Sequence, residues 1–249
     1  MSIEQTRTKL SEMKLHGMAK SFASQLSSAT AQGLAFEDRF GMIVDDEITD
    51  RENRRLQLLL RGAKLKINAH LEALDRSAKR KLDWELITNL GSCQWVQRGI
   101  NLVISGKCGT GKSWLSCALA HRACVHGYSA QYHRLNLLLQ DLVQARHDGS
   151  FRKRLVLLTR YSLLILDDLG VSERLTPTEC EIMLELLDSR TPGRSTLVTS
   201  QLPLDRWYDY LSVSNRTTAD ALLDRLISNS IKLELDGDSL RPKYAAKLE

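Results

Sequence analysis

The phosphate-loop motif at residues 106–113 constrains this chain more than any other feature of its sequence. The residues read Gly-Lys-Cys-Gly-Thr-Gly-Lys-Ser, which fits the pattern G-x-x-x-x-G-K-S. An apolar run, 102–104, precedes the motif, and a stretch typical of a helix, 114–126, follows it. Glycines let successive backbone N–H groups turn inward at a helix N-terminus, where they bind phosphate. A Gly-rich turn without this role is the alternative, and the flanking strand and helix argue against it.

The motif predicts that the chain binds a nucleoside triphosphate together with Mg²⁺, and we expect the nucleotide to be ATP. We expect Lys112 to reach the β- and γ-phosphates and the Ser113 hydroxyl to ligate Mg²⁺. The residues expected to bind the nucleotide are Gly106, Lys107, Cys108, Gly109, Thr110, Gly111, Lys112, Ser113 and Trp114.

From residue 100 onward, strand and helix patterns alternate, which predicts an α/β fold. Strand candidates lie at 101–105, 129–133, 163–167, 196–200 and 231–235. Helix candidates lie at 112–126, 135–147, 151–160, 177–190 and 217–228. The helix at 177–190 begins with a capping box formed by Thr176 and Glu179. Such alternation predicts right-handed crossovers and a mainly parallel sheet with helices on both faces.

The first hundred residues carry no strand pattern and have the periodicity of helices. Residues 3–28 show an amphipathic period, a second helical stretch begins at Phe36, and residues 45–61 form a charged helical pattern. We therefore expect three parts: a helical N-terminal domain at 1–70, a basic connector at 71–99 and an ATPase domain at 100–249.

Two carboxylates follow the most apolar of the strand candidates. Residues 163–166 read Leu-Leu-Ile-Leu, and Asp167 and Asp168 come next. Ligands of open α/β sheets bind at the carboxyl ends of the strands. We expect Asp167 to hold the Mg²⁺ shell together with Ser113, and Asp168 to orient the attacking water. A buried strand that merely ends in polar residues is the alternative.

Two further groups are expected to complete a site that hydrolyses ATP. The strand candidate at 196–200 ends in polar residues, and Gln201 is favoured over Ser200 as the sensor of the γ-phosphate. An arginine is also expected to stabilise the charge of the transition state. Arg225 and Arg241 are the candidates, although the spacing of each equally allows a structural ion pair with a neighbouring aspartate.

The distribution of positive charge points to a polyanionic partner. The chain has 35 Lys and Arg against 30 Asp and Glu, and two clusters hold much of the excess. Such clusters supply the phosphate contacts of nucleic-acid binding, although a solvated helix face is the alternative for each cluster. The expected DNA contacts are Arg51, Arg54, Arg55, Lys64, Lys66, Arg152, Lys153 and Arg154.

Composition also limits the setting in which the chain works. No apolar run approaches the roughly 18 residues that span a membrane, and residues 1–20 lack the apolar core of a signal peptide. The five cysteines have no C-x-x-C spacing, so neither a disulfide framework nor a zinc site is predicted. We expect a cytoplasmic protein with no membrane partner.

The order and spacing of these motifs resemble the IstB-type ATPases of bacterial insertion sequences, which are relatives of the DnaC-type helicase loaders within the AAA+ superfamily. The resemblance covers nearly the whole chain. Besides the phosphate loop, it rests on these segments: Lys14–Ala19, similar to the signature L-x-G-M-A; Glu47 with Arg51, Arg54 and Arg55; Leu166–Gly170; Thr199–Gln201; Trp207; Asp224–Leu226; and Gly237–Arg241.

The resemblance implies a fold and a mode of action. It implies a P-loop AAA+ module that assembles with ATP into a homo-oligomer on duplex DNA, where an arginine of one subunit completes the site of its neighbour. It implies that Gln201 is the first sensor and Arg225 the trans-acting finger, and with Lys112 and Asp168 they form the expected catalytic set. It assigns no role to Arg241.

The resemblance also implies a partner and a biological role. The family works with a transposase, promotes target-site selection in DNA transposition, and is released from DNA by hydrolysis. We expect this hydrolysis to be slow and stimulated by DNA. A helicase loader that binds a replicative helicase and single-stranded DNA is the alternative, and the L-x-G-M-A segment and the basic stretch 51–81 favour the transposition protein.

Three features depart from the family pattern. Asp168 stands where the family usually has Glu, and Gln201 stands where it usually has Asn, so each side chain differs in length by one methylene. Lys107 and Cys108 replace a common Pro-Pro in the phosphate loop. The change at Asp168 bears on the rate of hydrolysis rather than on binding, which leaves open a protein that binds ATP and barely turns it over.

Overall fold

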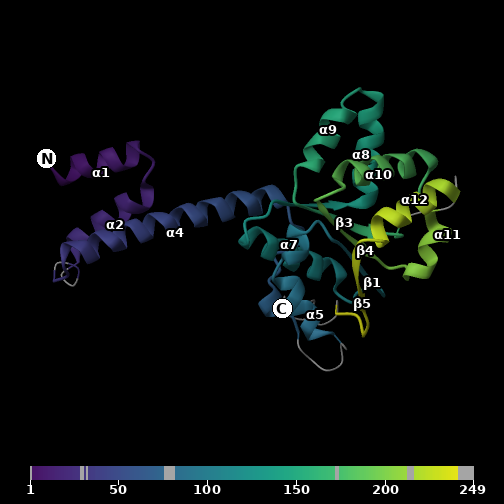
Figure 1. The fold of residues 1–249 in the computed structure, drawn as a ribbon, viewed down its shortest axis with the longest axis horizontal. Coiled ribbons are helices and arrows are strands. Elements are labelled where there is room, and N and C mark those ends of the chain that lie inside the picture. Colours follow the sequence, from purple (N-terminus) through teal and green to yellow (C-terminus); the bar gives the residue numbers. More distant parts are fainter. Residues whose placement is uncertain are drawn as a thin grey trace, which may run out of the picture. The chain divides into compact units, whose positions relative to one another are not determined.

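The chain forms two compact units, residues 1–58 and 59–249 (Figure 1). The computed structural model describes residues 2–28, 31, 33–75, 82–171, 174–211 and 216–240. The boundary between the units lies between Leu58 and Leu59, whereas the sequence pattern predicts a domain limit at residue 70. No helix in the described part of the chain is long and apolar enough to cross a membrane.

The first unit is helical, as the sequence predicted, and its helices are α1 (Ile3–Glu12), α2 (His16–Ser27) and α4 (Phe36–Ala63), the last of which extends past the boundary. The amphipathic pattern over 3–28 is not continuous, because the chain turns at Lys14, whose φ is 62°. The Leu15 N–H donates to the Leu10 carbonyl at 2.8 Å, as in a Schellman helix end. The turn therefore separates α1 from α2.

The two N-terminal motifs, Lys14–Ala19 and the Glu47 helix, meet where α2 crosses α4. A Cβ atom at Gly17 would lie 2.6 Å from both the Asp46 carbonyl oxygen and the Glu47 Cα, so the crossing requires glycine. The Met18 N–H donates to Glu47 Oε2 at 3.1 Å, and Arg51 Nε lies 2.7 Å from Glu47 Oε1. The Glu47 carboxylate thus caps the N-terminus of α2 and joins the two helices.

Helix α4 is continuous over 28 residues, although the sequence suggested two helical stretches. No proline occurs between its ends, and a mid-helix glycine such as Gly41 costs only about 1 kcal/mol relative to alanine. Ion pairs one turn apart support the helix, among them Arg54 Nε with Asp50 Oδ2 at 2.7 Å. These terms favour one long helix over a break.

The second unit is built on a five-stranded parallel sheet with the strand order β2-β3-β4-β1-β5. All five predicted strands are present, and their bounds are β1 (Asn101–Gly106), β2 (Ala130–Arg134), β3 (Leu163–Leu169), β4 (Ser195–Ser200) and β5 (Ser230–Leu235). Because all pairs are parallel, the carboxyl ends of β1, β3 and β4 meet at one edge of the sheet.

Helices connect these strands as the alternating pattern predicted. The predicted helices are α7 (Lys112–Val125), α8 (Leu135–His147), α9 (Phe151–Thr159), α10 (Pro177–Arg190) and α12 (Arg216–Ile227). The capping box of α10 is confirmed, since the Glu179 N–H donates to Thr176 Oγ1 at 3.3 Å.

Several short helices were not predicted. They are η1 (Leu71–Ala73), α5 (Trp84–Gly91), α6 (Gln94–Gln97), η3 (Leu204–Arg206) and α11 (Trp207–Leu211). The first three lie in 71–99, the segment expected to be a basic connector. Leu90 and Trp95 of this segment are buried, and the Trp95 indole N–H donates to the Leu90 carbonyl at 3.0 Å. This part of the chain therefore packs within the second unit.

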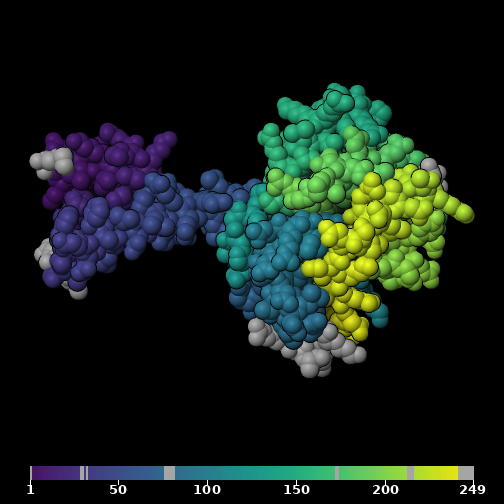
Figure 2. Space-filling model, in the orientation of Figure 1, coloured from purple at the N-terminus to yellow at the C-terminus, as the bar shows by residue number. Residues whose placement is uncertain are grey.

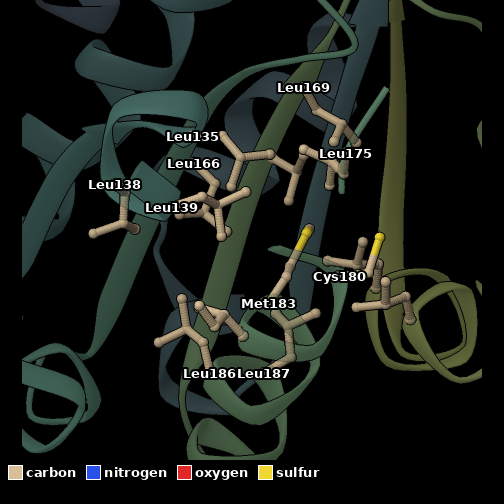
Figure 3. Close-up of a cluster of buried hydrophobic side chains, with 14 of the residues drawn as sticks. Leu135, Leu138, Leu139, Leu166, Leu169, Leu175, Cys180, Met183, Leu186 and Leu187 are labelled. Carbon is tan, nitrogen blue, oxygen red and sulfur yellow. The ribbon is translucent and has the colours of Figure 1, made fainter. Parts of the chain in front are cut away.

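Helices cover both faces of the sheet. Helix α7 contacts β1 through β4, whereas α8 contacts β2 and β3 and packs on α9 and α10. Figure 3 shows Leu139 of α8 and Met183 of α10 in the apolar cluster that also contains Leu166 of β3. In Figure 2 the yellow residues of α12 and β5 lie against the blue-green part of the chain, in agreement with the pairing of β5 with β1. The sheet whose strand ends form the candidate site is thus packed between two layers of helices.

Candidate nucleotide-binding site

The phosphate loop follows β1 and leads into α7, as the motif predicted. A Cβ atom at Gly106, whose φ is 147°, would lie 2.3 Å from the Leu235 carbonyl oxygen of β5, so only glycine fits there. The Lys112 ammonium is buried inside the loop and donates to the Gly106 and Lys107 carbonyls at 2.7 and 2.8 Å. The positive charge therefore lies at the N-terminus of α7, where the helix dipole also favours an anion.

A cavity of about 660 Å³ opens beside this loop, which is within the range of small-molecule sites. Its wall includes these predicted nucleotide-binding residues: Cys108, Gly109, Gly111, Lys112, Ser113 and Trp114. Gly106, Lys107 and Thr110 belong to the loop but not to this wall. Asp168 and Gln201 line the cavity from the ends of β3 and β4. The strand ends and the loop thus share one site.

Asp167 is the buried acidic group of the site, and hydroxyl groups surround its carboxylate. Ser113 Oγ donates to Oδ1 at 2.9 Å, and the Thr199 hydroxyl donates to the same oxygen. The Tyr132 hydroxyl donates to Oδ2. Burial, together with the hydrogen bond to Asp167, raises the pKa of Tyr132 well above its usual range, so the phenol stays a donor. The Asp167 side chain is fully buried and makes no ion pair with any residue that the structure describes.

This donor set fits a nucleotide-bound Mg²⁺ ion. Magnesium prefers oxygen ligands and, when carried by phosphates, takes few ligands from the protein. Ser113 supplies a hydroxyl, and Asp167 supplies a carboxylate that is ion-paired with none of the described residues. Within the described ranges, no group of three His, Cys, Asp or Glu residues is placed to hold a metal by itself. The residues present therefore suit an ion that arrives with a triphosphate.

Asp168 reaches the same site because β3 bulges at its end. Leu166 pairs with Val198 and Leu169 with Ser200, so β3 has one residue more than β4 between these pairs. Asp168 has a φ of 70°, a left-handed conformation that aspartate tolerates better than most residues. Successive strand residues normally face opposite sides of a sheet. The extra residue redirects the side chain, so that Asp168 lines the cavity, whereas Asp167 is buried behind the wall.

The three polar side chains at the end of β4, Thr199, Ser200 and Gln201, have different partners. The Thr199 hydroxyl accepts the Asp168 N–H at 3.0 Å as well as donating to Asp167. Ser200, the second choice for the γ-phosphate sensor, is fully buried and donates to the Leu169 carbonyl at 2.8 Å. Gln201, the favoured sensor, is the one of the three that lines the cavity. Thr199 therefore positions both acidic residues, a role that the sequence pattern does not predict.

Arg225 lies on α12 and does not line the cavity. Its guanidinium pairs with Asp188 of α10 and, at 3.6 Å, with Asp224. The hydrogen bond that the Arg225 guanidinium donates to Asp188 raises the pKa of Arg225 above its ordinary value. The ion pair that the spacing allowed is thus present within the chain, and the finger role of Arg225 stays a prediction. Arg241, the other candidate, lies outside the described residues.

The expected DNA contacts have different surroundings. Arg51 and Arg54 pair with Glu47 and Asp50 in the first unit. Lys66 lines the nucleotide cavity instead of a separate basic face. Arg55 and Lys64 are exposed. The cluster on α9 is exposed and forms no ion pair within the described part of the chain; its members are Arg152, Lys153 and Arg154. In Figure 2, α9 lies at the outer surface of the second unit.

The segment that follows β5 covers the phosphate loop. The Leu240 N–H donates to the Gly109 carbonyl at 3.0 Å, and Leu240 also lines the cavity. A Cβ atom at Gly109 would lie 2.1 Å from Ser239 Oγ. Part of the family's closing segment, residues 237–240, thus contacts the loop. Trp207, another family position, is fully buried and donates to the Leu202 carbonyl at 3.1 Å, which is a packing role.

Sequence reasoning missed Tyr132 and Arg134, both near the end of β2. Tyr132 bonds Asp167, and Arg134 Nε lies 3.5 Å from Asp168 Oδ2. No motif includes these residues. The one available signal was their place at the carboxyl end of a strand candidate, where ligands of such sheets bind.

Comparison with known proteins identifies relatives along most of the chain. The family model described as IstB-like ATP binding protein matches residues 8–247. An insertion-sequence ATP-binding protein of Sinorhizobium fredii is 41% identical over 232 residues, which cover 93% of this chain and 92% of the relative. Another, of Pseudomonas fluorescens, is 41% identical over 204 residues, covering 82% and 88%. Among solved structures, the DnaC helicase loader superposes with a TM-score of 0.57 at 21% identity, over 70% of this chain and 100% of the loader. That likeness concerns the fold.

Proposed function

This chain belongs to the family of IstB-like ATP binding proteins, and on that premise we propose that it is a DNA-stimulated ATPase of an insertion sequence. In this proposal it assembles with ATP on duplex DNA, assists a transposase in target-site selection, and leaves the DNA after slow hydrolysis. We place this work in the bacterial cytoplasm, where the DNA is. The insertion-sequence relatives from bacteria support the proposal.

One observation carries the ATPase assignment. The buried Asp167 carboxylate accepts the Ser113 hydroxyl of the phosphate loop at 2.9 Å, and Asp168 lines the cavity next to that loop. A triphosphate on the loop would thus have an Mg²⁺-binding pair on one side and a second carboxylate facing the bound phosphates. A site that only held phosphate would not need the second carboxylate.

The residues have distinct roles in the proposed mechanism. Lys112 and the N-terminus of α7 bind the phosphates and balance their charge. Ser113 and Asp167 would hold Mg²⁺, which would supply positive charge to the phosphate oxygens. Asp168 accepts a hydrogen bond from the attacking water and orients it, and Gln201 donates to the γ-phosphate. Positioning and electrostatic stabilisation supply most of the catalysis in phosphoryl transfer.

Assembly on DNA is tested by sedimentation of the full chain with duplex DNA and Mg²⁺. We expect large complexes with a slowly hydrolysed ATP analogue and their loss with ADP. Phosphate release measured in parallel should increase when DNA is added. A chain that stays monomeric with DNA and ATP contradicts the assembly proposal, and one that releases no phosphate contradicts the ATPase assignment.

The trans-acting role of Arg225 is a separate part of the proposal. An arginine finger commonly adds on the order of 10³-fold or more to hydrolysis. Arg225→Ala should therefore abolish DNA-stimulated hydrolysis, whereas Asp188→Asn, which breaks the same internal ion pair, should leave most of it. Equal and small effects of both substitutions would mean that Arg225 only joins α12 to α10.

Among the proposed DNA contacts, we single out the basic cluster on α9, because its side chains are exposed and form no ion pair with the described residues. Each phosphate contact contributes about 0.9 to the slope of log affinity against log salt. Replacing Arg152, Lys153 and Arg154 together by Gln should reduce that slope by about 1 to 3. The control is Arg98→Gln, which removes an exposed arginine outside both clusters. An unchanged slope in the triple variant would mean that the cluster is a solvated helix face.

A further inference from the structure

We infer that Tyr132 is a positioning residue for Asp167 and that its hydroxyl sets the affinity of the site for Mg²⁺; the inference rests on the proposed function. Tyr132 lies on the edge strand β2, which pairs with β3 in parallel register. Its side chain is only 8% exposed and reaches the carboxylate of the neighbouring strand. The phosphate-loop and acidic motifs do not include it.

Tyr132 has a place at Asp167 that no other described residue fills. Ser113 and Thr199 both donate to Oδ1, whereas Oδ2 accepts a hydrogen bond from Tyr132 alone among the described residues. When Ser113 binds an ion, Thr199 still holds Oδ1 and Tyr132 still holds Oδ2. Two donors on different oxygens fix the plane of the carboxylate. Removing the tyrosine hydroxyl leaves one oxygen of a fully buried carboxylate without a partner.

The chemistry of this donor suits a cation site. A buried carboxylate must be hydrogen-bonded or paired with a charge. An arginine or lysine would satisfy Asp167 but would also cancel the charge that attracts Mg²⁺. A phenol donates a hydrogen bond and carries no net charge. The cationic residue of β2, Arg134, pairs with Asp168 instead. Asp167 is thus held in place while it keeps its negative charge for the ion.

Hydrogen-bond donors behind a metal-binding carboxylate typically change metal affinity by about 10- to 100-fold. Tyr132→Phe deletes the hydroxyl and keeps the ring in its buried position. We expect the variant to need at least about tenfold more Mg²⁺ than the parent for half-maximal strengthening of nucleotide binding. Binding of the nucleotide in EDTA should be the same in both, because the phosphate loop is untouched.

The experiment is a Mg²⁺ titration of the full chain with a fluorescent ATP analogue at fixed concentration. Tyr210→Phe is the matched control: Tyr210 is also buried, on α11, away from the cavity. It should have the Mg²⁺ midpoint of the parent. If nucleotide binding by the parent chain does not depend on Mg²⁺, the result contradicts the proposed function. A parent that responds, with Tyr132→Phe at the same midpoint, overturns the inference about Tyr132.

A double variant tests whether the Tyr132 hydroxyl affects the Mg²⁺ midpoint through Asp167. It also covers the case in which Tyr132→Phe alone folds poorly. In Asp167→Asn the carboxylate that needs the phenol is gone. Adding Tyr132→Phe to this background should leave its Mg²⁺ midpoint unchanged. A further rise in the midpoint would show that the hydroxyl acts through another group, and the inference would fail.

Discussion

The Arg134 guanidinium lies 3.5 Å from the Asp168 carboxylate, so the residue proposed to orient water is ion-paired before any ligand arrives. Asp168 is largely buried, whereas half of the Arg134 side chain is exposed. An ion pair with one exposed partner contributes about 1 kcal/mol or less. The contact is therefore weak enough to be exchanged for a contact with water or substrate.

Arg134→Ala should raise hydrolysis in the absence of DNA, because Asp168 is then free to orient water. The limit is about fivefold, which corresponds to about 1 kcal/mol. Phosphate release under saturating ATP measures it, and Arg134→Lys, which keeps the charge, serves as the control. A strong loss of hydrolysis in Arg134→Ala would mean that the arginine supports Asp168 instead of restraining it.

Asp168→Asn should abolish most hydrolysis and preserve binding. Asparagine tolerates the left-handed backbone that Asp168 adopts, so the bulge of β3 is kept. Loss of an acid–base or water-orienting carboxylate costs about 10²- to 10⁴-fold. Single-turnover hydrolysis and the affinity for a fluorescent ATP analogue separate the two effects. If affinity fell as much as the rate, Asp168 would serve binding.

Lys112→Ala should abolish nucleotide binding, because the ammonium inside the loop is lost. Lys107→Ala is the matched control, since Lys107 belongs to the same loop but is exposed and does not line the cavity. Calorimetric titration with ATP and Mg²⁺ distinguishes the two variants. Comparable weakening by both substitutions would argue for a diffuse charge effect.

Gly17→Ala should loosen the crossing of α2 and α4. The added Cβ would overlap the α4 backbone, and such overpacking costs about 1–3 kcal/mol. Amide hydrogen exchange of α2 in the full chain reports the loss. Gly41→Ala is the control on α4: its Cβ would meet no atom within 4 Å, so helix propensity should make it neutral or slightly stabilising. Equal exchange in both variants would contradict the tight crossing.

The same crossing should weaken in acid. Burial raises the pKa of Glu47, but hydrogen bonds from Arg51, Met18 and Gly17 outweigh burial and lower the pKa below its ordinary value. A lowered pKa gives stability that is present above the ordinary value and lost as pH falls through the folded value. Exchange of α2 amides, corrected for intrinsic rates, should therefore rise below about pH 4.5. Glu47→Gln should remove this pH dependence, and Glu52→Gln, on an exposed position of α4, should keep it.

The sequence predicted the fold well because each strand of the second unit is a short apolar run followed by a helix. Ser113 was expected from the phosphate-loop motif and Asp167 from its place at the end of an apolar strand, and Ser113 Oγ lies 2.9 Å from Asp167 Oδ1. The short helices α5 and α11 were missed, since a turn or two of helix carries little periodicity. Tyr132 was missed for another reason. Its partner, Asp167, belongs to the adjacent strand, and the local sequence pattern does not predict which strands are neighbours in the sheet. The bulge at Asp168 depends on a positive φ, which aspartate tolerates but does not require, so the residue type alone does not predict it.

The contact between Ser239 and Gly109 links two parts of the chain that are far apart in sequence. The Leu240 N–H donates to the Gly109 carbonyl at 3.0 Å, and Ser239 leaves no room for a side chain at Gly109, so the segment after β5 packs directly on the loop. A triphosphate bound to this loop would therefore lie beside the end of the described chain, because Leu240 lines the same cavity.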